Sequence, residues 1–260
     1  MEVVIVAGPV EVGAFAAGRI ADLVSGKPEA VLGVATGSSP LETYRALAAR
    51  RGAGLDLSRV SAFALDEYVG IAHDHPESYH AVVAREVALP LGLDPSRVHV
   101  PDGLAADLDA AAAGYEAQIV AAGGVDLQLL GIGANGHIGF NEPTSSLSSR
   151  TRVKTLAPRT RQDNARFFDS PDEVPMHCLT QGLGTILDAR RALLVAQGAS
   201  KAHAIAQIVE GPVSSMWPGS VLQLHRHATV VIDEAAAAEL TLTDYYRSTV
   251  EHRGVVQPDA

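Results

Sequence analysis

The chain has 260 residues, 47% of them hydrophobic and 19% charged, and its formal net charge is −10. This composition is typical of a folded globular protein and not of a disordered segment. The negative charge disfavours a broad surface for nucleic acid or anionic membranes, because both require positive potential. We therefore expect no nucleic-acid partner and no membrane partner, but a small diffusible ligand.

Short apolar runs rich in β-branched residues alternate with longer segments of helical periodicity, which is typical of a mainly parallel sheet covered by helices. The predicted strands are 2–7, 30–35, 60–65, 126–131, 191–196 and 228–233. The predicted helices are 9–24, 40–50, 76–88, 105–122, 175–188, 199–210 and 234–249. Pro40 suits the first turn of the second helix and places Ser39 at its N-cap.

The pattern contains no internal repeat and no long linker. We therefore expect a single α/β domain over residues 1–260, Rossmann-like, with a mainly parallel sheet and helices on both faces. Residues 257–260 are expected to fray. In open sheets of this kind ligands bind beyond the carboxyl ends of the strands, so the loops that follow the strands are where chemistry is expected.

Two further features predict a cytoplasmic location. The N-terminus lacks the positive region and long apolar core of a secretory signal, and no stretch reaches the ~18 apolar residues of a membrane span. The single cysteine, Cys178, cannot form an internal disulfide, which suits a reducing compartment. Its neighbours predict a helix, in which the thiol fills an apolar position rather than acting as a nucleophile.

The first loop with chemical character follows the strand at 30–35. The hydroxyls of Thr36, Ser38 and Ser39 accompany the backbone amides of a helix start, an arrangement that favours an anion such as phosphate. The loop, which also contains Gly37, has neither the ending of a Walker loop nor the dinucleotide-binding fingerprint. Simple helix capping accounts for this composition equally well.

The second loop begins with two adjacent carboxylates, Asp66 and Glu67, at the end of the strand at 60–65. Burial and mutual repulsion raise the pKa of at least one member of such a pair, which is what a general base near neutral pH requires. The alternative, in which the two residues only begin the next loop, is about equally favoured by the residues alone.

The third loop holds four glycines between Gly131 and Gly139, together with His137 and, just beyond, Glu142. So many glycines indicate close backbone approach or positive φ. A histidine in such a frame, held in one tautomer by a neighbouring polar group, can transfer a proton. We favour this function over a purely structural histidine.

Basic residues are concentrated at 150–166, where six cations face one acid and the local charge is +6 − 1 = +5. One or two of them are expected to contact a phosphate, while a solvated basic face accounts for the others. The pairs His73/His75 and His225/His227 lack the spacing of metal ligands. We therefore expect neither a metal site nor a cofactor.

Taken in order, several motifs make the chain resemble the glucosamine-6-phosphate deaminase family, also called the glucosamine/galactosamine-6-phosphate isomerase family. They are "ATGSSP", "LDEYVG", "HPESY", "GIGANGHIGFNEP", "SSLSSRTRVKT", "ARFFD", "VPMHCLTQGLGTILDA" and "WPGSVLQLH". The related 6-phosphogluconolactonases are similar at the first loop but do not combine "LDEYVG" with "GHIGFNEP". The resemblance implies conversion of glucosamine 6-phosphate and water to fructose 6-phosphate and ammonia, in amino-sugar catabolism and without a cofactor.

The resemblance also implies roles for individual residues. Asp66 matches the general base that moves a proton from carbon 2 to carbon 1, His137 the histidine that assists ring opening, and Glu142 the carboxylate that orients it. Many members have Asp where this chain has Asn135. We expect the Asn135 carbonyl to accept a hydrogen bond from the imidazole, and the loss of a negative charge there to lower the histidine pKa and shift the pH optimum.

The phosphate-binding residues implied by the resemblance are Thr36, Gly37, Ser38, Ser39, Arg166 and Lys201. Arg166 falls in the family's mobile lid, roughly residues 152–182 here. Ser145, Arg152 and Lys154 match part of an allosteric pocket that binds N-acetylglucosamine 6-phosphate in hexameric members. Whether this chain forms a homo-oligomer, whether it is activated and which epimer it prefers stay open.

Two other functions are compatible with parts of this pattern. A sugar-phosphate sensor without activity is one, but no helix-turn-helix or basic arm accompanies the ligand-binding motifs. A lactonase or a deaminase for the epimeric amino sugar phosphate is the other, because motifs do not define pocket stereochemistry.

Overall fold

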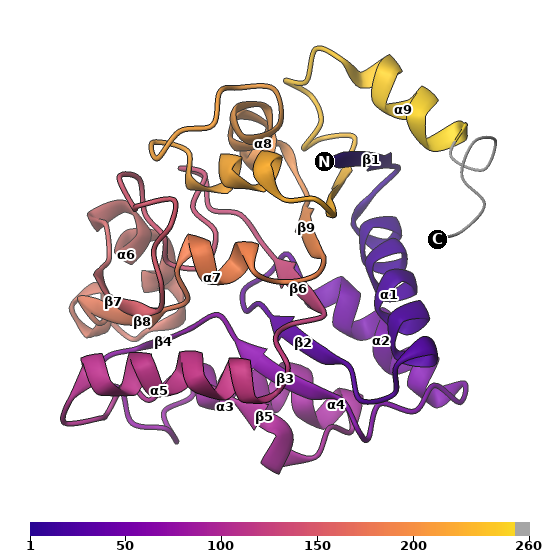
Figure 1. Ribbon diagram of the computed structural model, residues 1–260. Coiled ribbons are helices and arrows are strands. Elements are labelled where there is room, and N and C mark those ends of the chain that lie inside the picture. Colours follow the sequence, from indigo (N-terminus) through magenta and orange to yellow (C-terminus); the bar gives the residue numbers. More distant parts are fainter. Residues whose placement is uncertain (253–260) are drawn as a thin grey trace.

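A seven-stranded sheet forms the centre of the computed structural model, which describes residues 1–252 (Figure 1). The strand order is β1-β10-β9-β6-β2-β3-β5, and every pairing is parallel. The strands are β1 (Glu2–Val6), β2 (Val31–Val34), β3 (Ser61–Ala64), β5 (Val98–His99), β6 (Leu127–Leu130), β9 (Ala192–Ala196) and β10 (Ala228–Asp233). The expected fraying at 257–260 lies outside the described residues.

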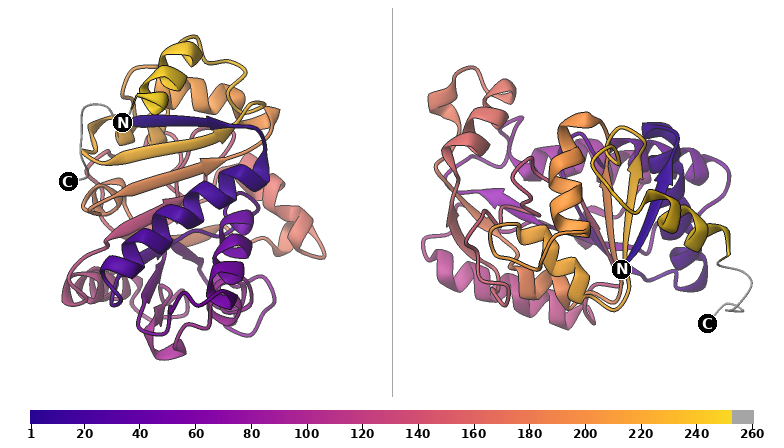
Figure 2. Two further views of the ribbon diagram at one scale, coloured as in Figure 1. Left: turned by 90° about the vertical axis from the view of Figure 1, so that its right-hand side faces the viewer. Right: turned by 90° about the horizontal axis from the view of Figure 1, so that it is seen from above.

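Helices cover both faces of the sheet (Figure 2). One face packs against α1 (Pro9–Gly26), α2 (Leu41–Gly52) and the helical run made of α3 (Tyr79–Val83), a π-helical turn at Ala84–Ala88 and α4 (Leu89–Leu91). The other face packs against α5 (Leu108–Ala121), α7 (Leu183–Leu187) and α8 (Ala202–Val209). Because successive strand residues face opposite sides, Leu32 and Val34 join one apolar core whereas Val31 joins another. The predicted parallel α/β architecture is confirmed.

A second, smaller sheet is antiparallel and was not predicted. Its order is β4-β8-β7, with β4 at Asp66–Tyr68, β8 at His177–Thr180 and β7 at Arg152–Thr155. The predicted helix at 175–188 is therefore wrong in its first half, which forms β8, and the helix α7 begins at Leu183. Pairing with strands on both sides overrides the local helical pattern. Cys178 consequently lies in a strand, fully buried as expected.

The helix predicted at 234–249 is also partly wrong, because turns occupy 234–239 and α9 spans Thr243–Glu251. Side chains account for the interruption: Asp233 accepts a hydrogen bond from the Ala236 amide at 2.8 Å, and Glu210 accepts one from the Leu242 amide at 2.9 Å. Ser39 is not the N-cap of α2, since Pro40 occupies that position and the helix begins one residue later.

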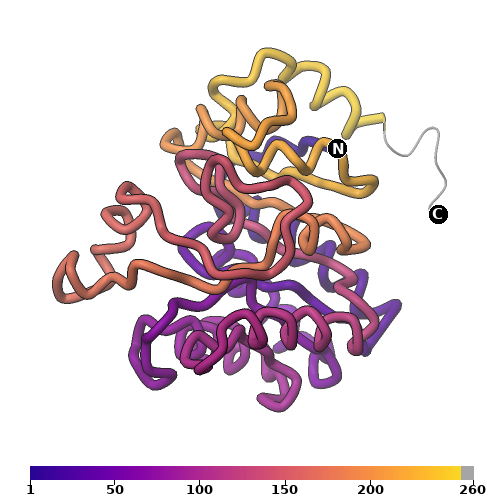
Figure 3. Tube along the Cα trace, turned by 60° about the vertical axis from the view of Figure 1, so that its left-hand side comes forward, coloured from indigo at the N-terminus to yellow at the C-terminus, as the bar shows by residue number. Residues whose placement is uncertain are grey.

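The chain between β7 and β8, residues 156–176, forms an excursion that stands away from the rest of the molecule (Figure 3). We call it the β7–β8 segment. It contains α6 (Pro158–Asn164) and two 3₁₀ turns, Ala165–Phe167 and Pro171–Glu173. Among the described residues, no helix has the length and apolar character needed to cross a membrane.

Candidate active site

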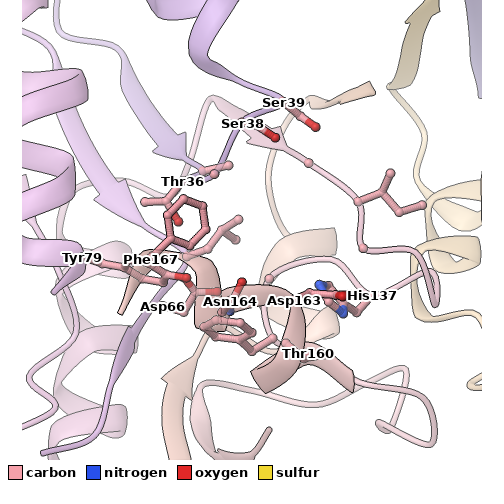
Figure 4. Close-up of a pocket in the computed structure, with 18 of the residues that line it drawn as sticks. Thr36, Ser38, Ser39, Asp66, Tyr79, His137, Thr160, Asp163, Asn164 and Phe167 are labelled. Atoms are coloured by element: carbon pink, nitrogen blue, oxygen red, sulfur yellow. The ribbon is translucent and has the colours of Figure 1, made fainter. Parts of the chain in front are cut away.

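A pocket of about 510 Å³ lies at the carboxyl ends of four parallel strands, β2, β3, β6 and β9. Figure 4 shows residues of three of these loops around it, among them Ser38, Asp66 and His137. The β7–β8 segment forms a further wall through α6 and the turn after it. This position is the one expected for a ligand site in an open parallel sheet.

The loop after β2 supplies one side of the pocket. Thr36, Gly37, Ser38 and Ser39 all line it, and α2 starts directly behind them. Gly37 has φ +90°, a left-handed conformation in which most side chains are strained. The Gln197 side-chain amide donates to the Ser39 carbonyl at 2.9 Å and ties this loop to the end of β9. The result is a row of hydroxyls and a helix N-terminus facing the cavity, an arrangement suited to an anion.

Asp66 reaches the pocket from β4, which continues the chain directly after β3. Its side chain is buried, and burial together with the neighbouring Glu67 charge raises the pKa of Asp66 well above its usual range. Gly139 passes close by at φ +55°, and a β-carbon there would lie 3.5 Å from the Asp66 carboxylate and 3.0 Å from the Thr180 hydroxyl. The positive φ and the tight approach to Thr180 favour a glycine here, whereas the distance to the Asp66 carboxylate is an ordinary contact.

His137 lines the pocket from the loop after β6, with Glu142 behind it. The imidazole Nδ1 lies 3.5 Å from the Glu142 Oε2, a distance that indicates an ionic contact rather than a short hydrogen bond. Burial opposes ionisation of Glu142, but the close contact and charge of His137, together with Thr160 and Asn135 as hydrogen-bond donors, outweigh it and lower the pKa of Glu142 to about 2. Gly133 is required next to the ring, because a β-carbon there would lie 2.3 Å from the imidazole.

The Asn135 side chain was expected to accept a hydrogen bond from the His137 ring, but its hydrogen bonds go to other groups. Its Nδ2 donates to the Glu142 Oε2 at 2.8 Å, and its Oδ1 accepts from the His137 backbone amide at 3.2 Å. The side chain therefore ties the carboxylate to the loop that carries the histidine. The tight turn at Gly136, with φ +80°, brings the backbone amide of His137, rather than its ring, to the side-chain carbonyl of Asn135.

Both cations that the resemblance implies for the phosphate line the pocket. Lys201, at the turn before α8, donates from Nζ to the Ile132 carbonyl at 2.7 Å, and burial with the nearby Arg166 charge lowers its pKa. Arg166 lines the same pocket from the β7–β8 segment. Two other cations of the basic stretch pair with acids: Arg150, outside the pocket lining, with Glu116 and Asp188, and Arg159 with Asp163, both of which line the pocket.

Ser145, Arg152 and Lys154 are not part of the pocket lining. Ser145 is buried, and the two cations lie on β7. Over residues 1–252, no group of three His, Cys, Asp or Glu side chains could hold a metal ion. His73 instead stacks on His80 at 4.3 Å, and the His225 Nε2 contacts the Ala189 carbonyl at 2.7 Å.

The sequence reasoning did not single out several residues that line the pocket. These are Tyr79, Phe140, Thr160, Asp163, Asn164 and Phe168. Tyr79 and Phe140 belong to motifs that carry the family resemblance. Their position beside polar motif residues is the feature of the sequence that could have indicated that they line the pocket. The remaining four lie on the β7–β8 segment, where Asn164 donates to the Tyr68 hydroxyl at 3.0 Å. The resemblance assigns this segment to a lid, and Phe168 lies in its motif "ARFFD", but the residues themselves do not indicate which of the four side chains face the pocket.

Comparison with known proteins agrees with this geometry. A family model described as glucosamine-6-phosphate isomerases/6-phosphogluconolactonase matches residues 10–231. The chain belongs to this family. Within it, the chain is 58% identical over 253 residues to a glucosamine-6-phosphate deaminase from Pseudarthrobacter chlorophenolicus, covering 97% of this chain and 98% of that one. It is 59% identical over 255 residues to the deaminase of Cutibacterium acnes, covering 98% of each.

Solved structures of family members give the same result. One described as a monomeric glucosamine-6-phosphate deaminase matches with a TM-score of 0.89 and 44% identity, over 92% of this chain and 100% of that one. A 6-phosphogluconolactonase from Trypanosoma cruzi matches with a TM-score of 0.72 and 20% identity, over 92% of this chain and 97% of that one. The second likeness shows the shared fold alone.

Proposed function

We infer that this protein is a glucosamine-6-phosphate deaminase, which converts glucosamine 6-phosphate and water to fructose 6-phosphate and ammonia in amino-sugar catabolism. The relatives that are more than half identical over nearly the whole chain carry this name. The structural observation that carries the inference is the convergence of Asp66, His137 and the hydroxyl loop on one pocket. A carboxylate, an imidazole and a group of hydroxyls in the lining of one pocket support this function, because the reaction needs a base, a proton carrier and a phosphate site around one small molecule.

The phosphate of the substrate binds at the loop after β2 in this proposal. The hydroxyls of Thr36, Ser38 and Ser39 and the first amides of α2 donate to its oxygens, and Lys201 and Arg166 supply positive charge. His137, oriented by Glu142, takes the proton of the anomeric hydroxyl and returns one to the ring oxygen, which opens the ring. The open chain then extends from the anion site toward Asp66.

Asp66 carries out the isomerisation. Its carboxylate removes the proton from carbon 2 while the oxygen on carbon 1 takes up a proton, which gives an enolamine. It then returns the proton to carbon 1 while the amine nitrogen gives up a proton, which leaves an imine at carbon 2. Water adds to that imine, the carbon–nitrogen bond breaks, and ammonia departs as the carbonyl of fructose 6-phosphate forms. No external oxidant is needed for these steps, since carbon 1 is reduced as carbon 2 is oxidised.

The raised pKa of Asp66 predicts the acid side of the pH profile. A base must be ionised to act, so kcat/KM falls as the pH drops through the pKa of Asp66. Because burial and the Glu67 charge raise that pKa, the acid limb lies above the pH expected for an ordinary aspartate. Initial rates of ammonia release from pH 4 to 9 measure it, and a limb at an ordinary carboxyl pH contradicts the assignment of Asp66.

Substrate comparison tests the function itself. Purified protein is assayed for ammonia release from glucosamine 6-phosphate and galactosamine 6-phosphate, and for hydrolysis of 6-phosphogluconolactone. Release from the glucosamine compound supports the proposed reaction, and release from the galactosamine compound alone assigns the epimeric reaction. Lactone hydrolysis without ammonia release, or binding of the sugar phosphate without turnover, overturns it.

The lid, the allosteric residues and the assembly are further parts of the proposal. We propose that the β7–β8 segment closes over the bound sugar, so that Arg166 meets the phosphate and the intermediate is shielded from water.

Ser145, Arg152 and Lys154 remain candidates for an activator site, tested by repeating the assay with N-acetylglucosamine 6-phosphate. One relative of this fold is described as monomeric, so light scattering should give one-chain particles here. The cytoplasmic location stays a prediction.

A further inference from the structure

Glu67, the residue after Asp66, is a completely buried carboxylate outside the pocket lining. On the short strand β4 successive side chains face opposite sides, so Asp66 faces the pocket while Glu67 faces the start of α3. Its Oε1 accepts from the Tyr68 amide at 2.7 Å and from the Tyr79 amide at 3.0 Å, and its Oε2 accepts from the His80 amide at 2.9 Å. The mechanism above uses none of these contacts.

The two neighbouring carboxyls have unequal surroundings. Both are buried, and burial raises the pKa of each. Three backbone N–H groups oppose this effect at Glu67, whereas one, that of Phe140, opposes it at Asp66. Since N–H donors favour the ionised form, Glu67 holds its negative charge more readily, and Asp66 takes up a proton at a higher pH than Glu67.

His137, Lys201 and Arg166 line the same pocket as Asp66, whereas the phenols and the thiol packed around its carboxylate stay uncharged near neutral pH. Tyr68, Tyr79, Tyr115 and Cys178 all interact with its carboxylate, and burial raises the pKa of every one of them. On the far side of Glu67, His73 lies close enough for a protonated imidazole to favour the glutamate anion. Burial and His73 together lower the pKa of His80, whose side chain stacks on His73. Arg152 lies two strands from Asp66, across β8.

From these contacts we propose that Glu67 is a positioning residue of the deaminase site, whose amide-bound carboxylate maintains a fixed negative charge behind Asp66 and anchors the helix start that carries Tyr79. The inference rests on the proposed function. The fixed charge makes Asp66 a stronger base than an isolated aspartate, because it disfavours the second negative charge. The anchored amides hold the Tyr79 ring in the pocket wall.

Carboxyl ¹³C NMR titration of the full chain tests the order of ionisation without relying on activity. Labelled Asp and Glu carboxyls are followed from pH 3 to 9, and loss of a signal in Asp66→Asn or Glu67→Gln assigns each resonance. We expect Glu67 to ionise at the lower pH and Asp66 at the higher. The reverse order in the wild-type protein overturns the proposal, even where a variant folds poorly.

The pH–rate profile supplies the second test. In Glu67→Gln we expect the Asp66 midpoint and the acid limb of kcat/KM to move together to lower pH, with kcat on the plateau reduced roughly threefold to tenfold because the base is weaker. Glu67→Asp keeps the charge and should return the limb toward its wild-type position. A purely structural role would lower the rate and leave the limb where it was, and that result overturns the proposal.

Glu116→Gln is the matched control. Glu116 is also a largely buried carboxylate with several donors, among them the Thr151 amide at 2.8 Å, but it does not line the pocket. Its loss should reduce stability without moving the Asp66 midpoint, and a shift of equal size there contradicts the specific role of Glu67. A protein that releases no ammonia from any substrate overturns the function instead, and the NMR arm still decides the order of ionisation.

Discussion

Asp66 contributes to activity at the expense of stability. Its pKa is raised in the folded state, so its contribution to stability is present below the unfolded pKa and is lost as the pH rises through the folded pKa. At pH 7 the ionised side chain therefore destabilises the fold. We expect Asp66→Asn to raise the free energy of unfolding at pH 7 while reducing kcat on the order of 10²- to 10⁴-fold.

Urea denaturation and the ammonia assay measure both effects on the same preparation. Asp22→Ala, an exposed change on α1, serves as the control and should alter neither quantity. An Asp66→Asn protein that is less stable at pH 7 would contradict the buried, raised carboxyl described above.

Asn135 gives a second residue-scale prediction. Asn135→Asp replaces a donor to Glu142 at 2.8 Å with a like charge, so the Glu142 pKa should rise from about 2. Stability from ionised Glu142 is present above its unfolded pKa and lost as the pH falls through the folded one. In the variant this loss should begin at higher pH, and the free energy of unfolding at pH 7 should fall by about 1–3 kcal/mol.

Acid unfolding followed by tryptophan fluorescence measures the Asn135 effect. Gln118→Glu makes the same chemical change on the exposed face of α5 and should leave the unfolding curve in place. The pH–rate profile of Asn135→Asp should shift as well, and an unchanged profile together with unchanged acid unfolding contradicts the role given to Asn135.

At the scale of elements, Asp126 joins the amino ends of three central strands. It accepts from the Val31 amide at the start of β2 at 2.8 Å, and it pairs with Lys27 at 2.7 Å and with Arg190, just before β9, at 3.2 Å. Asp126→Ala leaves a buried amide without its acceptor, so we expect a loss of about 1–3 kcal/mol in the free energy of unfolding.

The two cations that pair with Asp126 should matter less. Both are about half exposed, and exposed ion pairs contribute about 0–1 kcal/mol. Thermal and urea unfolding of Lys27→Ala and Arg190→Ala, compared with Asp126→Ala, separate the buried amide bond from the ion pairs. Equal losses in all three variants would contradict this division.

Elements with a strong local signal could be predicted from the sequence, and elements stabilised by distant partners could not. Six of the seven parallel strands are mainly apolar runs that were predicted to within a residue or two, whereas the two-residue β5 was not predicted. β8 has no such signal: the stretch His177–Thr180 is short and resembles the start of the helix that follows. Its strand conformation depends on β4, over one hundred residues earlier, and on β7.

The candidate site divides in the same way. Loops that follow parallel strands could be placed together, because the carboxyl ends of those strands share one edge of the sheet. This rule brings Ser38, Asp66 and His137 to one pocket. Thr160 and Asn164 could not be placed, since they reach the pocket through an excursion whose direction is set by the β7–β8 pairing.

For the whole molecule, the pocket connects the two halves of the chain. Its lining comes from loops after β2 and β3 in the first half and after β6 and β9 in the second, so an unfolded chain cannot assemble it. Fructose 6-phosphate at a hundredfold its Kd should therefore add about 2.7 kcal/mol to the free energy of unfolding and raise the Tm by roughly 5–10 °C.

Differential scanning fluorimetry across a concentration series measures this stabilisation. Fructose without its phosphate is the matched ligand control and should leave the Tm unchanged at the same concentration, because the hydroxyl loop and Lys201 would have no anion to bind. A shift of similar size with both sugars would contradict phosphate recognition by this pocket.

The small antiparallel sheet determines how the excursion is attached. The chain leaves the body after Thr155 and returns at His177, two residues that face each other across the β7–β8 ladder, and β8 in turn pairs with the strand of Asp66. The two ends of the β7–β8 segment therefore lie side by side in one antiparallel strand pair. A shorter or longer insert between Thr155 and His177 should therefore change the cover of the pocket, while the pairing of β8 with β4 keeps Asp66 in position.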